Sequence, residues 1–414
     1  MRVAVTGLGC ITPIGNTVEA FREAMYAGRS GIREFAREFP GAVSTDPGLR
    51  FRTTALVKDL DPTSDLSSST LAATDRSAQF GILAAQQAVS DSDLLSRHDP
   101  AAIAVITGCA CGGRAADEEA NRELYIRNAR VPPTVILRTM ASSGASHIAT
   151  QFGVTGPVLN LATACASGTH AIGLAFQMVR SGMASAAIAG GHEAPLTFGF
   201  LRAWDSMRVV SPTACRPFSA DRDGMTLGEG AAMLVLEPLD AAVARGVHVY
   251  AEVIGFGMSA DAHHVTQPRA EGAALAMTRA LEDSRQAGIE DVASRVGYVN
   301  AHGTGTLTND AIEAEAIHKA LGAAAVQAPI GSTKSLTGHG IGAAGALEAL
   351  ATVLAMNAGR LPHTAGVTDV DSSLKLDVLV NEPREIDAKR DIALSNSLAF
   401  GGLNAVLAFR RLVP

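Results

Sequence analysis

A cysteine lies between small residues at the point where a strand is expected to turn into a helix. Cys165 is the fifth residue of the run LATACASGT, residues 161–169. The short apolar segment before it predicts a buried strand, and the small apolar stretch up to Gly182 predicts a buried helix. A helix N-terminus carries partial positive charge and free N–H groups, so this position favours the thiolate, the nucleophilic form of a cysteine.

Two histidines lie in equally unusual settings further along the chain. His302 follows the apolar segment 296–299 within NAHGTGT, and His339 follows the segment 328–330 within KSLTGHGIG. Each loop then leads into an Ala-rich helical stretch. All three side chains are therefore predicted at or beyond the C-terminal ends of strands, where open α/β sheets place their sites.

A cysteine with two histidines is typical of acyl chemistry or of metal binding. Zinc sites usually contain a closely spaced pair of ligands, and Cys165 and the two histidines lie far apart in the sequence. The close pairs Cys109/Cys111 and His263/His264 are weaker candidates, so no metal is predicted. A papain-type Cys/His pair in a thiol hydrolase is an alternative, but it leaves the second histidine and Lys334 unexplained.

Composition limits the class of protein that can hold these residues. The chain has 414 residues, 47% of them hydrophobic and 18% charged, enough for a large core in two or three domains or one duplicated unit. The net charge of −7 argues against a nucleic-acid binder. The five cysteines show no disulfide framework, which indicates reduced thiols and a cytoplasmic protein. We expect no signal peptide and no membrane span.

The chain also looks internally duplicated. Residues 158–193 predict a strand, the Cys165 turn, a small-residue helix and a second strand. Residues 328–360 predict a strand, a loop with Lys334 and His339, and a small-residue helix. We therefore expect two similar halves, residues 1–249 and 250–414, each with a sheet between helices.

Taken together, these motifs resemble the β-ketoacyl-acyl carrier protein synthases of the elongating, decarboxylating kind. The resemblance extends from residue 1 to residue 404, and it rests on the Cys-His-His set, the Lys334 loop, the loop FGG at 400–402 and the stretch RPFSADRDGMTLGEG at 216–230. It implies an α/β, thiolase-like fold whose two halves form a five-layered αβαβα arrangement. It also implies decarboxylative Claisen condensation of an acyl group on Cys165 with malonyl-acyl carrier protein, in fatty-acid or polyketide chain elongation.

The resemblance assigns roles around the acylated sulfur. Cys165 accepts the acyl group, and the backbone N–H groups of Cys165 and Phe400 bind the oxyanion. Gly401 and Gly402 hold the Phe400 N–H in place. His302 and His339 donate from Nε2 to the malonyl thioester oxygen as the enolate forms.

Other residues are implied to support these groups or the substrate. Lys334 orients its neighbours, and Glu348 supports it from the helix after His339. Thr304 and Thr306 hydrogen-bond the phosphopantetheine arm of the carrier protein, while Cys111 lines the acyl channel. Beyond that arm the resemblance implies no cofactor.

Related enzymes of the same superfamily are disfavoured by particular residues. Chain-length-factor and decarboxylase-only relatives replace the cysteine, so an inactive scaffold does not fit the retained Cys165. Synthases that start chains from acyl-CoA use an Asn with one His, whereas this chain has His339 at the second position. A thiolase needs a second cysteine near the C-terminus, and residues 395–404 contain none.

Several departures indicate a specialised enzyme. Ala399 and Leu403 flank the glycine loop, and Cys111 stands where a branched residue is usual. The segment 64–78 has only one basic residue, Arg76, for docking an acidic carrier protein. Other candidate docking residues are Arg202, Arg208 and Arg216.

The alternative function is therefore the ketosynthase subunit of a type II polyketide or polyene synthase. Its partners would be an acyl carrier protein and either a second copy of this chain, in a homodimer, or a cysteine-less chain-length factor, in a heterodimer.

Overall fold

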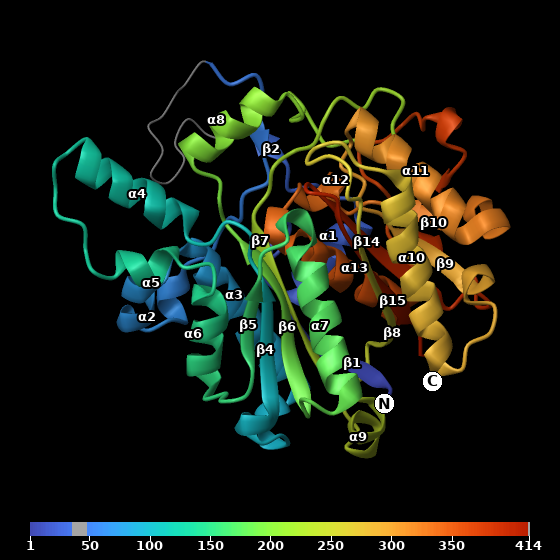
Figure 1. The fold of residues 1–414 in the computed structure, drawn as a ribbon, viewed down its shortest axis with the longest axis horizontal. Coiled ribbons are helices and arrows are strands. Elements are labelled where there is room, and N and C mark those ends of the chain that lie inside the picture. The colour runs from blue at the N-terminus through green and yellow to red at the C-terminus, as the bar shows by residue number, and fades with distance from the viewer. Residues whose placement is uncertain (35–47, 413–414) are drawn as a thin grey trace.

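One sheet of eleven strands runs through the computed structural model, which describes residues 1–34 and 48–412 (Figure 1). Its strand order is β12-β10-β9-β14-β15-β8-β1-β7-β6-β4-β5. The last five strands in this order, β1, β7, β6, β4 and β5, come from the first part of the chain, and the other six come from the second. The two parts thus occupy opposite sides of the molecule.

The two halves repeat the same order of elements. The first half contains β1 (Val3–Ile11), α3 (Arg76–Ser92), β4 (Ile103–Gly108), α6 (Ser143–Phe152), β5 (Val158–Leu161), α7 (Ser167–Ser181), β6 (Ala186–Glu193) and β7 (Gly230–Pro238). The second contains β8 (Ala251–Ala260), α10 (Ala270–Ser284), β9 (Val296–Asn300), α11 (Leu307–Leu321), β10 (Pro329–Gly331), α13 (Ala344–Ala358), β14 (Ile392–Ala399) and β15 (Leu403–Arg410), with β12 (Asp377–Val378) added at the edge. The predicted boundary at 249/250 falls between α9 (Leu239–Ala244) and β8.

Helices form three layers around the two sheet halves. Helices α3 and α6 pack on the outer face of the first half, and α10 packs with α11 on the outer face of the second. Helices α7 and α13 pack against each other between the halves and contact strands of both. The five-layered αβαβα arrangement is therefore confirmed.

The two halves also join edge to edge. Strand β1 pairs with β7 on one side and with β8 on the other, where Val3 faces Val253 and Val5 faces Ala251. The sequence predicted a separate sheet for each half, and this antiparallel pairing merges them. Every residue of β1 is buried, because strands flank it on both edges and helices cover both faces.

Close packing of α7 on α13 depends on glycines at their N-terminal ends. A Cβ atom at Gly345 would lie 2.0 Å from Thr169 Oγ1 and 2.8 Å from its backbone nitrogen. A Cβ atom at Gly168 would lie 2.7 Å from the backbone nitrogen of Ala346. The two helix ends therefore touch, and the loops that precede them, carrying Cys165 and His339, lie side by side.

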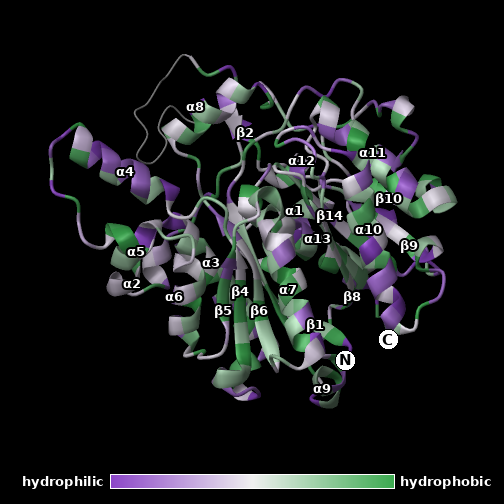
Figure 2. Cartoon of the chain, viewed as in Figure 1, coloured by the Kyte–Doolittle hydropathy of each residue, from purple (hydrophilic) through white to green (hydrophobic). Residues whose placement is uncertain are grey.

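Strand β5 is less buried than its apolar sequence predicted. It lies at the end of the sheet and pairs with β4, while Leu159 is 46% exposed. Further exposed apolar side chains lie on or beside α4 (Arg114–Tyr125), which is otherwise hydrophilic (Figure 2), and α5 (Val135–Thr139); they are Leu124, Tyr125, Ile126, Ile136, Leu137 and Met140. The prediction of a fully buried strand is wrong for the single chain because nothing in the described residues covers this edge.

A single helix in the described part of the chain is long and apolar enough to cross a membrane. The segment Ile341–Ala358, which includes α13, is 89% buried inside the protein. Its apolar sequence is accounted for by its place in the central helical layer.

Candidate active site

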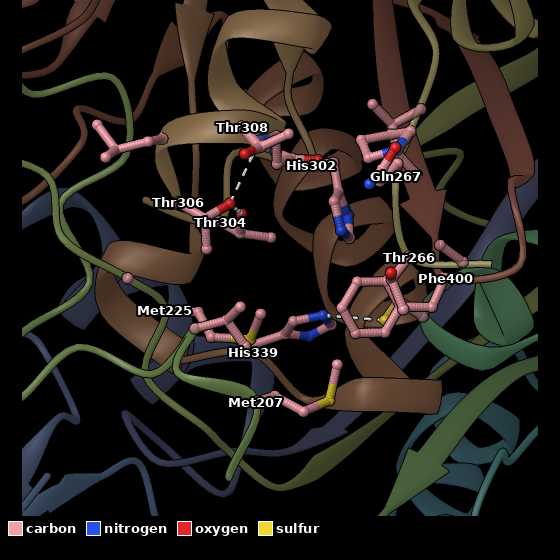
Figure 3. Close-up of a pocket in the computed structure, with 18 of the residues that line it drawn as sticks. Met207, Met225, Thr266, Gln267, His302, Thr304, Thr306, Thr308, His339 and Phe400 are labelled. Atoms are coloured by element: carbon pink, nitrogen blue, oxygen red, sulfur yellow. Dashed lines mark hydrogen bonds between the residues drawn. The ribbon is translucent and has the colours of Figure 1, made fainter. Parts of the chain in front are cut away.

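Cys165, His302 and His339 meet in one cavity of about 420 Å³ (Figure 3). They come from three separate segments: the turn before α7, the loop after β9 and the loop before α13. Phe400, at the end of β14, lines the same cavity. The structure thus brings together the three residues that the sequence motifs singled out.

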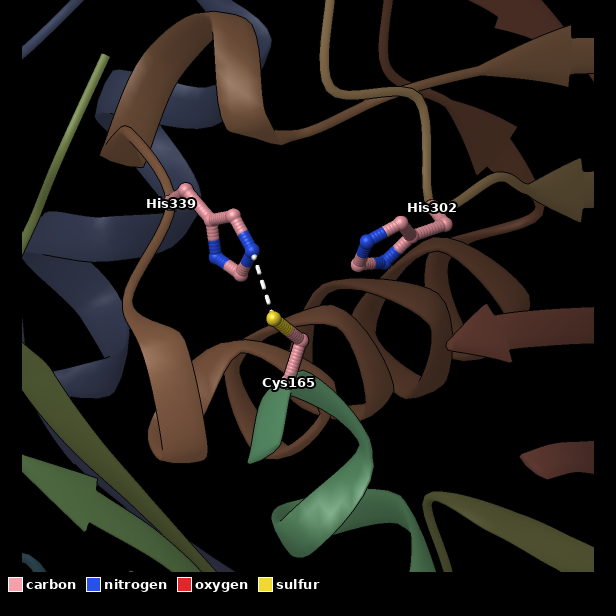
Figure 4. Close-up of side chains that lie close together, drawn as sticks. All are labelled: Cys165, His302 and His339. Carbon is pink, nitrogen blue, oxygen red and sulfur yellow. Dashed lines mark hydrogen bonds between the residues drawn. The ribbon is translucent and has the colours of Figure 1, made fainter. Parts of the chain in front are cut away.

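The three side chains point toward one another (Figure 4). His339 Nε2 lies 3.1 Å from Cys165 Sγ. The two imidazole rings meet edge to face, with 5.4 Å between their centroids and 86° between their planes. All three side chains are buried, and one nitrogen of each histidine and the sulfur lie within 4.8 Å of one another.

A tight turn presents Cys165 to the cavity. Ala164 adopts a left-handed conformation with φ of 49°, which is uncommon for a residue with a side chain. Ser167 holds the turn, because its hydroxyl donates to Ala164 O at 2.7 Å and accepts from Thr163 N at 2.9 Å. The backbone N–H groups of Phe400 and of Cys165 itself lie near enough to lower the pKa of the thiol. Both N–H groups are therefore on the side of the turn that carries the sulfur, and their predicted oxyanion role stays a prediction.

The thiol of Cys165 is less acidic than its helix N-terminal position predicted. Burial raises its pKa to about 11, although the Lys334 ammonium and the N–H of Phe400 act in the opposite direction. The desolvation of a buried thiolate outweighs the favourable dipoles around it. The sequence revealed the dipoles but not how completely the sulfur is buried.

Both histidines present a protonated Nε2 to the cavity. Ile341 N donates to His339 Nδ1 at 3.1 Å, and Lys334 Nζ donates to His302 Nδ1 at 3.1 Å. Each Nδ1 is therefore an acceptor, which leaves the proton on Nε2. Burial and the nearby Lys334 charge hold the pKa of both imidazoles well below the usual range. The site thus contains two neutral hydrogen-bond donors rather than two cations.

Lys334 and Glu348 form a buried ion pair behind His302. Lys334 Nζ also donates to the His302 carbonyl oxygen at 2.6 Å, and it forms a short contact with Glu348 Oε1. Burial raises the pKa of Glu348 to about 7, while Lys334 opposes that shift. Lys334 thus fixes the ring and backbone of His302, and Glu348 holds the ammonium in place.

Two carboxylates that the sequence analysis missed shape the His302 loop. Glu313 accepts hydrogen bonds from His302 N at 2.8 Å and Gly303 N at 2.7 Å. Asp310 accepts from the N–H groups of residues 304 and 305 at 3.1 and 3.2 Å. Both acids are fully buried on α11. The signal that could have revealed these two acids is their spacing of three residues at the start of the helix that follows the His-Gly-Thr-Gly loop.

Glu193, also missed, ties the His339 loop to the end of β4. Its carboxylate accepts from Gly342 N at 3.2 Å and from Ala110 N at 2.7 Å. Burial raises the pKa of Glu193 to about 7. Nothing in the local sequence indicated this role, because its partners lie about 80 and 150 residues away.

Thr304 and Thr306 line the cavity on the side of His302. Their hydroxyl oxygens lie 2.9 Å apart, and Thr306 Oγ1 also accepts from Asn309 N at 3.4 Å, which caps α11. On the other side, Gly401 and Gly402 have positive φ angles of 85° and 69°. Gly401 N donates to Val265 O at 2.7 Å, so a second loop holds the glycine loop.

Cys111 does not line this cavity. Its side chain packs on an apolar cluster that includes Ile341 and Trp204, and its N–H donates to Glu193. The acyl-channel role stays a prediction.

The candidate docking arginines differ in their surroundings. Arg76 forms an ion pair with Glu229 at 2.7 Å, and Arg216 pairs with the carboxylates of residues 221 and 223. Arg202 has an interaction partner of its own. Arg208 lies on the rim of the cavity and is exposed.

The Cys-His-His group is also compact enough to hold a metal ion. Because the Lys334 ammonium contacts His302, a divalent cation there would face a positive charge in a buried setting. The donor arrangement around the sulfur fits thioester chemistry better.

Comparison with known proteins agrees with this geometry. Residues 1–242 match the family described as Beta-ketoacyl synthase, N-terminal domain, and residues 250–368 match Beta-ketoacyl synthase, C-terminal domain. The chain is 39% identical over 412 residues to Nodulation protein E of Rhizobium sp. (strain N33), with 99% of each chain covered. It is 39% identical over 420 residues to 3-oxoacyl-[acyl-carrier-protein] synthase 2 of Synechocystis sp., covering 99% of this chain and 98% of the relative.

Solved structures show the same similarity. The ishigamide ketosynthase/chain length factor superposes with a TM-score of 0.91 at 32% identity, covering 100% of this chain and 99% of that one. A type II polyketide ketosynthase in complex with its acyl-carrier protein and bound to the hexaketide (AntDE:AntF) superposes with a TM-score of 0.86 at 30% identity, covering 99% of both chains.

Proposed function

Because this chain belongs to the β-ketoacyl synthase family, we propose that Cys165 carries the acyl group and that His302 and His339 stabilise the enolate. The protein is a 3-oxoacyl-[acyl-carrier-protein] synthase, an acyltransferase of fatty-acid or polyketide chain elongation. The observation that supports these roles best is the convergence of one thiol and two Nε2–H donors in a single buried cavity.

In the first half-reaction the sulfur of Cys165 attacks the thioester carbon of the acyl carrier protein. Negative charge moves to the carbonyl oxygen, where the N–H groups of Cys165 and Phe400 stabilise it. The bond to the carrier sulfur then breaks, and the carrier leaves as a thiol that takes up the proton released by Cys165. The pKa of about 11 means that this proton must leave as the substrate binds or reacts.

In the second half-reaction a malonyl thioester enters the part of the cavity that the phosphopantetheine arm of the first carrier protein has left. Its carbonyl oxygen accepts hydrogen bonds from Nε2 of His302 and His339. The bond to the carboxylate breaks, carbon dioxide leaves, and the electron pair forms the enolate. The enolate carbon attacks the acyl thioester, and Cys165 leaves as a thiolate. No general base is needed, which agrees with two neutral imidazoles acting as donors.

Thr304, Thr306 and the glycine loop fit supporting roles in the same scheme. The two hydroxyls line the cavity beside His302, where the phosphopantetheine amides can reach them. Gly401 and Gly402, both with positive φ, let the backbone turn directly after Phe400, which suits a fixed Phe400 N–H.

The test separates the two half-reactions. The protein is incubated with an acyl-carrier thioester and digested for mass spectrometry, and malonyl decarboxylation is measured separately. Cys165→Ala should lose the acyl adduct, whereas the control Cys10→Ala, which removes a buried thiol in β1, should keep it. His302→Ala and His339→Ala should each lower decarboxylation by about a hundredfold or more while affecting self-acylation less. An adduct on another cysteine would overturn the assignment.

A second candidate function is the ketosynthase subunit of a type II polyketide or polyene synthase. The full-length similarity to the ishigamide ketosynthase/chain length factor favours it. Purified alone, the chain should then be inactive and gain elongation activity with a cysteine-less sister subunit. Efficient elongation of saturated chains by the lone chain would instead favour fatty-acid synthesis.

The partner in either case is a homologous chain, and we propose that it covers the open edge at β5. The exposed Leu159, the free edge of that strand and the apolar side chains of α4 and α5 form one such surface. Leu159→Lys should halve the molar mass measured by light scattering. The control Leu275→Lys changes an exposed leucine on α10 and should leave the mass unchanged. An unchanged mass for Leu159→Lys would contradict this surface.

The acyl carrier protein is expected to dock near Arg208. This residue lies on the cavity rim, whereas Arg76 and Arg216 are paired with carboxylates. Arg208→Glu should raise KM for the carrier substrate, and high salt should reduce the difference. The control is Arg285→Glu, at the C-terminal end of α10 and about 22 Å along that helix from its start near the cavity-lining Pro268, and it should leave KM unchanged.

A cytoplasmic location is also proposed. All five cysteines are free, and four of them are buried, as expected for a protein of a reducing compartment. Detection in a periplasmic or secreted fraction would contradict it.

A further inference from the structure

The cavity has one aromatic wall, built around the only tryptophan in the chain. Trp204 lies on α8 (Phe198–Met207) and lines the cavity together with Phe400. The two rings are stacked, with 5.8 Å between centroids and 17° between planes. Phe200 packs against Trp204 from behind, edge to face, at a centroid distance of 6.0 Å. The indole is therefore held in one orientation.

Phe400, one ring of this wall, lies across the cavity from Thr304 and Thr306 (Figure 3). In Figure 3, Met207 and Met225 lie on the side of His339, across from Thr304 and Thr306. The threonine side suits a polar pantetheine arm. The other side presents the Phe400 ring and two polarisable thioethers, and methionine sulfur makes favourable contacts with π systems.

An acyl chain on Cys165 starts beside this wall. Cys165, Phe400 and Trp204 line the same cavity, so the first carbons of the chain lie close to the two rings. A saturated chain gains only from burial of its surface against the rings. A conjugated chain is planar and has its own π electrons, so stacking on the rings stabilises it in addition to burial. Contacts of this kind favour binding by about two- to tenfold beyond area burial.

We propose that Trp204, stacked on Phe400, makes this site selective for acyl chains with conjugated double bonds next to the thioester. The inference rests on the proposed acylation of Cys165. It goes beyond that role by naming the substrate class and the residue that selects it.

The test compares 2,4-hexadienoyl and hexanoyl groups on the carrier protein. The measured quantity is the ratio of their kcat/KM values for acylation of Cys165, dienoyl over saturated, because the ratio within each variant cancels losses common to both chains. The ratio should fall by about two- to tenfold from the wild type to Trp204→Leu. Trp204→Phe should keep most of it, and the control Phe152→Leu, which removes an aromatic ring at the end of α6 outside the cavity, should keep it all. An unchanged ratio in Trp204→Leu overturns the proposal.

A second measurement does not depend on any variant. Because Trp204 is the only tryptophan, the fluorescence of the wild type reports on this wall when it is excited at a wavelength that the four tyrosines do not absorb. Acylation with the dienoyl group should change the emission at least twofold more than acylation with hexanoyl; equal changes would contradict stacking. If neither chain acylates Cys165, the proposed function fails instead, so the two failures are distinguishable.

Discussion

The buried thiol of Cys165 has a measurable consequence for its reactivity. A pKa of about 11 means that the thiolate fraction grows about tenfold per pH unit throughout the neutral and mildly alkaline range. Alkylation of Cys165 by iodoacetamide should therefore rise about tenfold per unit from about pH 7 to about pH 10. Mass spectrometry of the Cys165 peptide gives the rate.

A variant of Lys334 tests the electrostatic cause of this pH dependence. Its positive charge lowers the pKa of Cys165, so Lys334→Met should raise that pKa and slow alkylation at every pH below it. A rate that levels off near pH 8 in the wild type would contradict the raised pKa.

Variants of the Lys334–Glu348 ion pair can separate its effect on the stability of the protein from its effect on decarboxylation. Glu348→Leu leaves an unpaired ammonium in a buried site and should cost about 3–5 kcal/mol of unfolding free energy. Adding Lys334→Met removes that charge and should recover most of the loss, as measured by urea unfolding. Decarboxylation should not recover, because His302 Nδ1 has lost its donor.

An exposed pair offers the contrast for this experiment. Glu315 pairs with Lys319 on the surface of α11, and Glu315→Leu should cost less than about 1 kcal/mol. If the double variant were as unstable as Glu348→Leu alone, the pair would not be the source of the loss.

The contact between α7 and α13 sets the distance between the two reactive loops. At Gly345 an added methyl group would collide with Thr169, including its backbone, so Gly345→Ala should cost about 1–3 kcal/mol and slow condensation. Gly199→Ala on α8 is the matched control. Its methyl group would meet only the end of the flexible Glu118 side chain, so stability should stay the same or rise. Equal costs in thermal unfolding would show that helix spacing is not the cause.

Local sequence predicted the loops at these helix ends better than it predicted their surroundings. The Cys165 turn and both histidine loops contain glycines and small residues that report directly on tight backbone conformation. The pairing of Arg76 with Glu229 links residues 153 positions apart, and no local pattern reveals it. Glu193 was missed for the same reason, because the backbone groups that it accepts from lie far away in the sequence, whereas Glu313 had a local signal in its spacing from Asp310.

At the scale of the whole fold, internal repetition was visible and strand neighbours were not. The two halves were predicted from similar spacings of elements around residues 165 and 339. The merging of their sheets through β1 and β8, and the exposure of β5 at the far edge, depend on which strands lie side by side. Strand alternation and hydrophobicity give the identity of a strand but not its partners, so these features needed the structure.

The place of β1 has a consequence for how the protein is made. It is synthesised well before its partners β7 and β8, which begin at residues 230 and 251. At synthesis rates of about 5–20 residues per second, this apolar strand waits about 10–50 s for its neighbours. Nascent chains stalled before residue 230 should therefore be cut by protease within residues 3–11, and chains extended past residue 260 should resist. The segment that ends as a fully buried strand thus begins as an exposed apolar stretch that chaperones can bind.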